Sequence, residues 1–177
     1  MTIGMVYVAM LGVALVATVT DTRSGRIPNW LTFPVLALAP LVHVAFGGLR
    51  MGLSSLMGVV ICGLVPLLFF KLGAMGGGDV KVFAALGALS GPQMGLEVQL
   101  ASMTVAFLYG VALVVVRGGL AKMFVVSGRV AANLVLPRSR RYTVEPSEMT
   151  SVRIGGAIFA GTLLCVGHDA WMRGLAL

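Results

Sequence analysis

The stretch that decides the fold class is LSSLMGVVICGLVPLLFFKL, residues 53–72. It is apolar along its length and carries one charge, on Lys71 near its end. A helix needs about 20 mostly apolar residues to cross the hydrocarbon core of a bilayer. Residues 53–72 therefore predict a transmembrane helix.

The composition of the whole chain agrees with this prediction. Of its 177 residues, 58% are hydrophobic and 11% are charged, and the mean hydropathy is +1.00. Soluble domains are about 25% charged, so this chain could not cover the surface of a soluble globule with solvated side chains. The net charge of +7 is typical of basic cytoplasmic loops. Since there is no basic tail and no interleaving of aromatic with basic residues, we expect no nucleic-acid partner.

Five further apolar stretches predict helices on the same argument. They are Ile3–Val19, Trp30–Phe46, Val82–Leu89, Val98–Val116 and Ile154–Val166. The stretch 82–89 is short, and a helix from Asp79 to about Met94 would lengthen it. The predicted fold class is all-α: a polytopic membrane protein with about six transmembrane helices, forming one domain over residues 1–177.

One polar section, residues 117–151, separates the last two spans. Within it, residues 120–136 place Lys122, Arg129 and Asn133 on one helical face. That pattern suits a helix lying in the membrane interface, or a helix packed on the bundle, and the sequence leaves both open.

The basic residues predict the orientation. If all six helices cross, eleven Lys and Arg residues fall on one side and two, Arg50 and Arg173, on the other. The eleven are Arg23, Arg26, Lys71, Lys81, Arg117, Lys122, Arg129, Arg138, Arg140, Arg141 and Arg153. Because basic loops stay in the cytoplasm, we expect residues 21–29, 73–81 and 117–151 to be cytoplasmic and both termini to lie on the outer side.

Two of the six carboxylate residues are candidates for a functional role. Asp21 and Asp79 each adjoin an apolar helix on the predicted cytoplasmic side. Carboxylates at membrane depth are costly and usually have a partner or a function. Their presence is explained equally well by ion pairs, of Asp21 with Arg23 or Arg26 and of Asp79 with Lys81.

The backbone beside each aspartate is unusual. Gly76-Gly77-Gly78 precedes Asp79, and Ile27-Pro28-Asn29 follows Asp21. Glycine permits a positive φ or a close approach of the backbone, and we expect that need at Gly78 and not at Gly73. Proline at position 28 predicts a rigid turn into the next helix.

These segments resemble the two motifs of type IV prepilin peptidases. DTRSGRIPN, residues 21–29, is similar to their D-x-R-x-x-R-I-P-N segment, and GGGDVK, residues 76–81, to their G-x-G-D-x-K segment. The resemblance implies that Asp21 and Asp79 are the catalytic pair of an aspartyl protease. Eight further residues would shape the site or bind substrate: Gly76, Gly77, Gly78, Lys81, Arg23, Arg26, Pro28 and Asn29. The general preference of basic residues for the cytoplasmic side of a membrane explains Arg23, Arg26 and Lys81 about as well.

The chain departs from the larger members of that family. These carry a cytoplasmic insertion near the N-terminus, often with CxxC pairs, that is associated with methylation of the new N-terminus. Here the first span runs straight into Asp21, and the cysteines are Cys62 and Cys165 alone. The chain therefore resembles the short, peptidase-only branch that serves tight-adherence (Flp-type) pili.

The resemblance implies a substrate and a location. The substrate would be a prepilin or pseudopilin, cut at the cytoplasmic face of the bacterial inner membrane by a water that the two aspartates activate. We expect no cofactor and no metal, since no cluster of His, Cys and carboxylates has metal-ligand spacing. Two alternatives are a presenilin-like intramembrane protease, whose first aspartate would lie inside a helix, and a transporter or proton relay, whose carboxylates would lie near the bilayer midplane.

Overall fold

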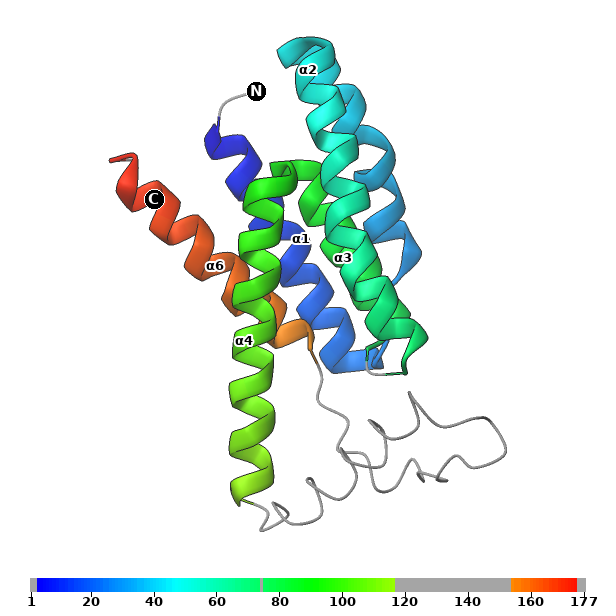
Figure 1. Ribbon diagram of the computed structural model, residues 1–177, viewed down its shortest axis with the longest axis vertical. Helices are drawn as coiled ribbons and strands as arrows, with labels where there is room; N and C mark the ends of the chain where they lie inside the picture. Colours follow the sequence, from blue (N-terminus) through cyan, green and yellow to red (C-terminus); the bar gives the residue numbers. More distant parts are fainter. Residues whose placement is uncertain (1–2, 74, 117–153, 175–177) are drawn as a thin grey trace. The chain divides into compact units, whose positions relative to one another are not determined.

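The computed structural model describes residues 3–73, 75–116 and 154–174, and its regular elements there are all α-helices. They are α1 (Ile3–Ser24), α2 (Asn29–Lys71), α3 (Gly77–Ser90), α4 (Pro92–Val116) and α6 (Gly155–Met172) (Figure 1). The all-α prediction is confirmed for these residues, and the predicted helix 120–136 lies outside them. The chain divides into two compact units, residues 1–105 with 153–177 and residues 106–152. The packing described below lies within the first unit.

Helix α2 is broken in the middle. Gly48 has φ 71° and ψ −177°, which no helix contains. A Cβ atom on Gly52 would lie 2.1 Å from Cγ2 of Val44, although residues eight apart on a straight helix are separated by about 12 Å. The chain therefore folds back at Gly48, and Figure 1 shows the two arms of α2 side by side. The arms correspond to the predicted spans Trp30–Phe46 and Leu53–Leu72.

Helix α3 ends earlier than the longer of the two predicted ranges. Gly91 has φ +81°, a left-handed conformation that ends the helix. Pro92 then begins α4, and proline favours the first position of a helix. The fourth helix does extend back to include Asp79, but Met94 belongs to α4, so the extension beyond Ser90 to about Met94 is wrong.

Close backbone contacts enclose α3. Every residue from Val82 to Leu89 is buried. A Cβ atom on Gly58 in α2 would lie 2.0 Å from the carbonyl oxygen of Gly87, and one on Gly95 in α4 would lie 2.9 Å from the Cα atom of Gly87. Small residues at a crossing let membrane helices approach this closely. Helix α3 is thus the centre of the bundle.

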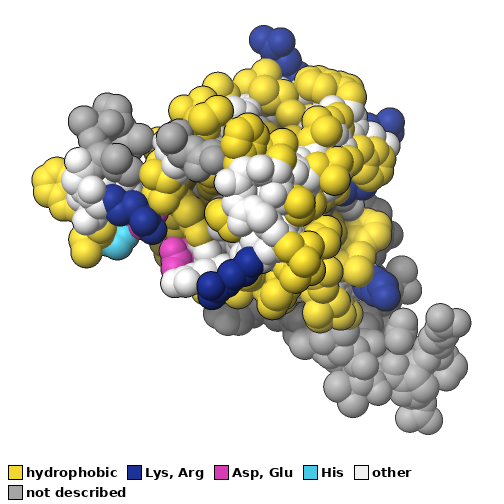
Figure 2. All heavy atoms as spheres, turned by 90° about the horizontal axis from the view of Figure 1, so that it is seen from above, with side chains coloured by type: hydrophobic (Ala, Val, Ile, Leu, Met, Phe, Trp, Pro, Cys, Tyr) yellow, Lys and Arg dark blue, Asp and Glu magenta, His cyan; other side chains and the backbone are white. Residues whose placement is uncertain are grey.

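The outer surface is apolar, as expected of a membrane protein. By length and composition, three helical stretches among the described residues could cross a bilayer: Ile3–Ser24, Asn29–Lys71 and Pro92–Leu113. Large apolar side chains face outward on these helices, with Val8 73% and Phe46 72% exposed. Figure 2 shows hydrophobic side chains over most of the described part of one end of the molecule. Because α3 and α6 are not among these three stretches, the count of six spans stays a prediction.

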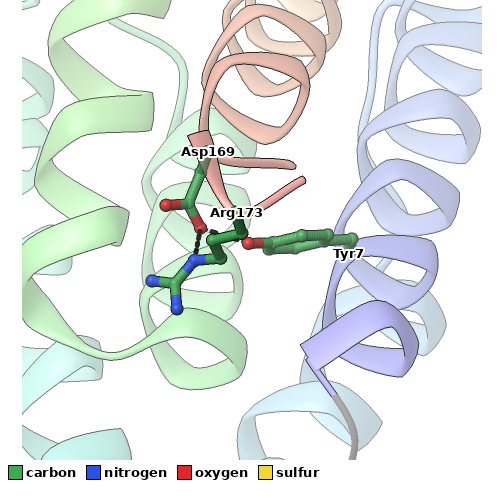
Figure 3. Close-up of polar contacts among 3 residues, drawn as sticks. All are labelled: Tyr7, Asp169 and Arg173. Atoms are coloured by element: carbon green, nitrogen blue, oxygen red, sulfur yellow. Dashed lines mark hydrogen bonds and ion pairs between the residues drawn. The ribbon is translucent and has the colours of Figure 1, made fainter. Parts of the chain in front are cut away.

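Helix α6 is bound to α1 near both of its ends. It continues past the predicted end at Val166 and includes Asp169. The hydroxyl of Tyr7, which is buried, donates a hydrogen bond to Oδ2 of Asp169, and Nε of Arg173 donates to the same oxygen at 2.9 Å (Figure 3). At the other end of α6, Oγ1 of Thr18 donates to the carbonyl oxygen of Gly155 at 2.8 Å. These contacts fix α6 along α1.

We expect Tyr7→Phe to lower the free energy of unfolding by about 1.5–3 kcal/mol at pH 7, the range for hydrogen bonds to charged groups. The hydrogen bond from Tyr7, aided by Arg173, holds the pKa of Asp169, which lies beyond the predicted span, below its usual range. Its contribution is therefore complete above the unfolded pKa of about 3.9 and is lost as the pH falls through the lower folded pKa. Unfolding in detergent should show a gap between wild type and Tyr7→Phe that is constant from pH 7 to about 4 and narrows below that.

Tyr109→Phe is the control, because Tyr109 is exposed and its change should stay within about 0.5 kcal/mol. A gap for Tyr7→Phe that is the same at every pH would contradict the assignment to Asp169.

Candidate functional site

Asp21 lies in the last turn of α1, not in a loop after it. The helix runs past the predicted end at Val19 because hydroxyl side chains bond back to its carbonyls: Oγ1 of Thr20 donates to the oxygen of Val16 at 2.8 Å, and Oγ of Ser24 to that of Thr20 at 2.7 Å. Such bonds satisfy polar side chains within a helix. Gly25, with φ +63°, then ends α1, and its N–H donates to the carbonyl oxygen of Asp21 at 2.8 Å.

Asp79 lies in the first turn of α3. Its N–H donates to the carbonyl oxygen of Gly76 at 3.2 Å, and its carboxylate lies against Gly76. This is the arrangement of an acidic residue at the third position of a helix, where the helix dipole also favours negative charge. The side chain is buried, with 9% of its surface exposed.

The structure brings Asp21 and Asp79 within electrostatic range of each other. The packing of α1 and the following turn against α3 places them there. A Cβ atom on Gly78 would lie 3.0 Å from Cβ of Ile27, so the residue before Asp79 touches the segment after Asp21. Two carboxylates at neighbouring helix ends could share a proton and act on a bound water.

Lys81 and Asn29 join the two motif segments. Nζ of Lys81 donates to Oδ1 of Asn29 at 2.7 Å and lies 5.2 Å from the centre of the Phe33 ring, within the range of a cation–π interaction. Pro28, with φ −73° and ψ 145°, precedes the first residue of α2 and forms the predicted turn. The start of α2 is thus linked to the start of α3.

The open alternative of simple charge pairs is wrong for the described residues. The ion pair found among them joins Arg173 to Asp169, and Lys81 bonds to Asn29 instead of Asp79. Arg23 and Arg26 are exposed, and neither makes an ion pair with Asp21.

Of the two reasons considered for the glycine run, the structure excludes one. Glycines with positive φ are Gly25, Gly48, Gly73, Gly91 and Gly174, and none of residues 76–78 is among them. Gly73, and not Gly78, is therefore the residue with a left-handed conformation. The other reason, a close approach of the backbone, is supported for contacts within the protein. A Cβ atom on Gly77 would lie 3.2 Å from the Phe70 ring, and one on Gly76 would lie 3.1 Å from Oδ2 of Asp79.

Gly155 is a neighbour of Asp21 that the sequence analysis missed. Its N–H donates to Oδ2 of Asp21 at 3.1 Å. The two residues are 134 positions apart, and nothing in the pattern of a glycine before an apolar stretch indicates which carboxylate it will meet.

Comparison with known proteins links the chain to one family. The model of the type IV leader peptidase family matches residues 8–111. The chain is 34% identical over 86 residues to a preflagellin peptidase of Methanococcus voltae, covering 46% of this chain and 36% of that protein. It is 31% identical over 98 residues to a prepilin leader peptidase/N-methyltransferase of Vibrio cholerae serotype O1, covering 51% and 38% respectively. The chain thus matches little more than a third of the length of either relative. No solved structure shows a significant match.

The backbone conformations predict which glycine in this region matters most for stability. Gly73→Ala forces alanine into a left-handed conformation and should cost roughly 1–2 kcal/mol of unfolding free energy. Gly78→Ala must shift Ile27 slightly, but alanine favours the helix by roughly 0.5–1 kcal/mol, so its net loss should be smaller. Unfolding of both variants in detergent checks this order, and a greater loss for Gly78→Ala would contradict it.

Proposed function

Because the chain belongs to the type IV leader peptidase family, we propose that it is a membrane-embedded aspartyl endopeptidase that removes the leader peptides of prepilins or pseudopilins. The family match spans residues 8–111 and includes both aspartates. The observation that carries the proposal is the contact of Gly78, beside Asp79, with Ile27 in the segment after Asp21, which brings the two carboxylates within electrostatic range. The names of the two relatives, one acting on preflagellin and one on prepilin, support a substrate of this class.

The proposed reaction uses the two carboxylates as a unit. Two such groups side by side cannot both ionise cheaply, so they share one proton. Asp79 is the more buried, and burial disfavours a charge, so Asp79 holds that proton in the resting enzyme. Asp21 takes a proton from the water as its oxygen attacks the scissile carbonyl carbon, and Asp79 donates to the carbonyl oxygen. Collapse of the tetrahedral intermediate breaks the C–N bond: the amine leaves with the proton that Asp21 took up, and a hydroxyl of the intermediate returns a proton to Asp79. No cofactor is needed for these steps.

The finer proposal concerns the kind of pilin. We propose a member of the peptidase-only branch that serves tight-adherence (Flp-type) pili. In support, α1 runs unbroken into Asp21, which leaves no room between them for the insertion of the larger members.

The proposed location is the bacterial inner membrane, with the site facing the cytoplasm. A prepilin carries a basic leader ahead of a membrane-held hydrophobic helix, so its cleavage point lies at the cytoplasmic boundary. The excess of basic residues on the side of Asp21 and Asp79 supports this orientation.

The position of Asp21 in α1 is compatible with a presenilin-like protease. That alternative expects the first aspartate inside a helix, and Asp21 does lie within the last turn of α1. The family match, and not the position of Asp21, favours the leader peptidase. For a transporter the positions still count against the alternative, because both aspartates lie at helix ends.

Asp21→Asn and Asp79→Asn should each abolish cleavage of a prepilin by the purified protein in detergent, since an amide cannot share the required proton. Glu97→Gln, which changes an exposed carboxylate on α4, is the matched control and should cleave normally. Membrane yield and thermal unfolding should be unchanged in all three variants. Substantial turnover by either Asp→Asn variant would remove that aspartate from the proposed pair.

Variants with one added cysteine test the orientation. Ser24 at the end of α1 and Arg50 beside the fold-back in α2 are both exposed. An impermeant maleimide should label Arg50→Cys in intact cells and Ser24→Cys only after the cells are opened, with the wild-type chain as background. The reverse pattern would overturn the proposed cytoplasmic site.

A further inference from the structure

The first peptide of α6 is held against Asp21 from two sides. The N–H groups of the first turn of a helix have no partner within the helix, and Ile154, the residue before α6, supplies no side-chain hydrogen bond. The N–H of Gly155 instead donates to Oδ2 of Asp21 at 3.1 Å. Its carbonyl oxygen accepts from Oγ1 of Thr18 at 2.8 Å, and this hydroxyl is shared with the carbonyl oxygen of Ala14, also at 2.8 Å. Thr18 lies one turn earlier on α1 than Asp21.

The contact is too close for a side chain at position 155. A Cβ atom there would lie 2.8 Å from Oδ2 and 2.9 Å from Cβ of Asp21, and 3.2 Å from the Cα atom of Thr18. The last of these is a backbone atom of α1, so rotation of a side chain could not relieve that contact. Gly156, the next residue, has no atom within 4 Å of the position of its Cβ.

We propose that Gly155 is a positioning residue for the reaction: its N–H holds Oδ2 of Asp21, which leaves Oδ1 as the oxygen that shares a proton with Asp79 and takes a proton from the water. The inference rests on the proposed function, and it adds a third helix to a site otherwise formed by α1 and α3. That helix lies outside the segment 8–111 that matches the family.

Gly155→Ala should therefore reduce kcat for a synthetic prepilin by about a hundredfold, the loss expected when a catalytic group is misplaced by about 1 Å. KM should change little, because Gly155 acts on Asp21 and not on the substrate. Gly156→Ala is the matched control: it makes the same exchange one residue along the same helix turn and should keep kcat. Equal kcat values for the two variants, or a loss confined to KM, would overturn the proposal.

Thr18→Val provides a second variant in case Gly155→Ala fails to fold. It removes the hydrogen bond to the carbonyl oxygen of Gly155 and adds no atom at position 155. The peptide of Gly155 is then held on one side only, and kcat should fall while KM stays constant. A Thr18→Val enzyme with unchanged kcat would contradict the positioning role.

A spectroscopic measurement separates this inference from the proposed function. The chain has three aspartates, Asp21, Asp79 and Asp169, so protein labelled with 13C at the aspartate carboxyl gives three signals that Asp→Asn variants assign. In Gly155→Ala the Asp21 signal should shift while the Asp169 signal does not, and Gly156→Ala should leave both in place. If the wild type failed to cleave prepilin while Asp21 responded in this way, the proposed function would fail and the contact would stand. If the wild type cleaved and the Asp21 signal stayed in place, the positioning role would fail alone.

Discussion

The architecture depends on the close approach of two backbones, at Gly58 in α2 and Gly87 in α3. A Cβ atom on either glycine would lie within 2.4 Å of the carbonyl oxygen of the other. Helices that meet this closely gain van der Waals contacts along their whole crossing, which is the main attraction available between apolar helices in lipid. Because α3 is enclosed, its first turn is fixed relative to its neighbours. Asp79 is therefore carried on a rigid element, and its position does not depend on a loop.

Asp21 is held differently, by polar contacts between α1 and α6. Tyr7 and Asp169 join these helices near one end, and Thr18 and Gly155 join them near the other. Hydrogen bonds between membrane helices contribute little individually, but two that lie far apart also fix the alignment of the helices. The alignment determines which peptide of α6 meets Asp21. In this way a tyrosine distant from the site affects the geometry around the carboxylate.

The sequence was most informative where a pattern is local. Apolar runs predicted the helices, including the break in α2 between residues 46 and 53, and two short motifs indicated the aspartates that the structure brings together. It was least informative where a contact joins distant segments. Local composition does not predict the contact of Gly58 with Gly87 or that of Gly155 with Asp21. The end of α1 was misplaced at Val19 because Thr20 and Ser24 look like loop residues until their bonds to helix carbonyls are seen. A positive φ or a close approach was expected at Gly78, beside the aspartate, whereas the positive φ lies at Gly73, just after the end of α2.

The helix ends at the site explain why two carboxylates can be tolerated together. Asp79 lies at the N-terminal end of α3, where the partial positive charge of the helix favours an acidic group. Asp21 is placed less favourably, since it lies in the last turn of α1, where the partial charge is negative. The N-terminal end of α6 offsets this, because it directs the N–H of Gly155 at the carboxylate. A site made of α1 and α3 alone would leave an ionised Asp21 facing both the end of its own helix and Asp79. The third helix removes that conflict, so it contributes to the electrostatics of the site as well as to its geometry.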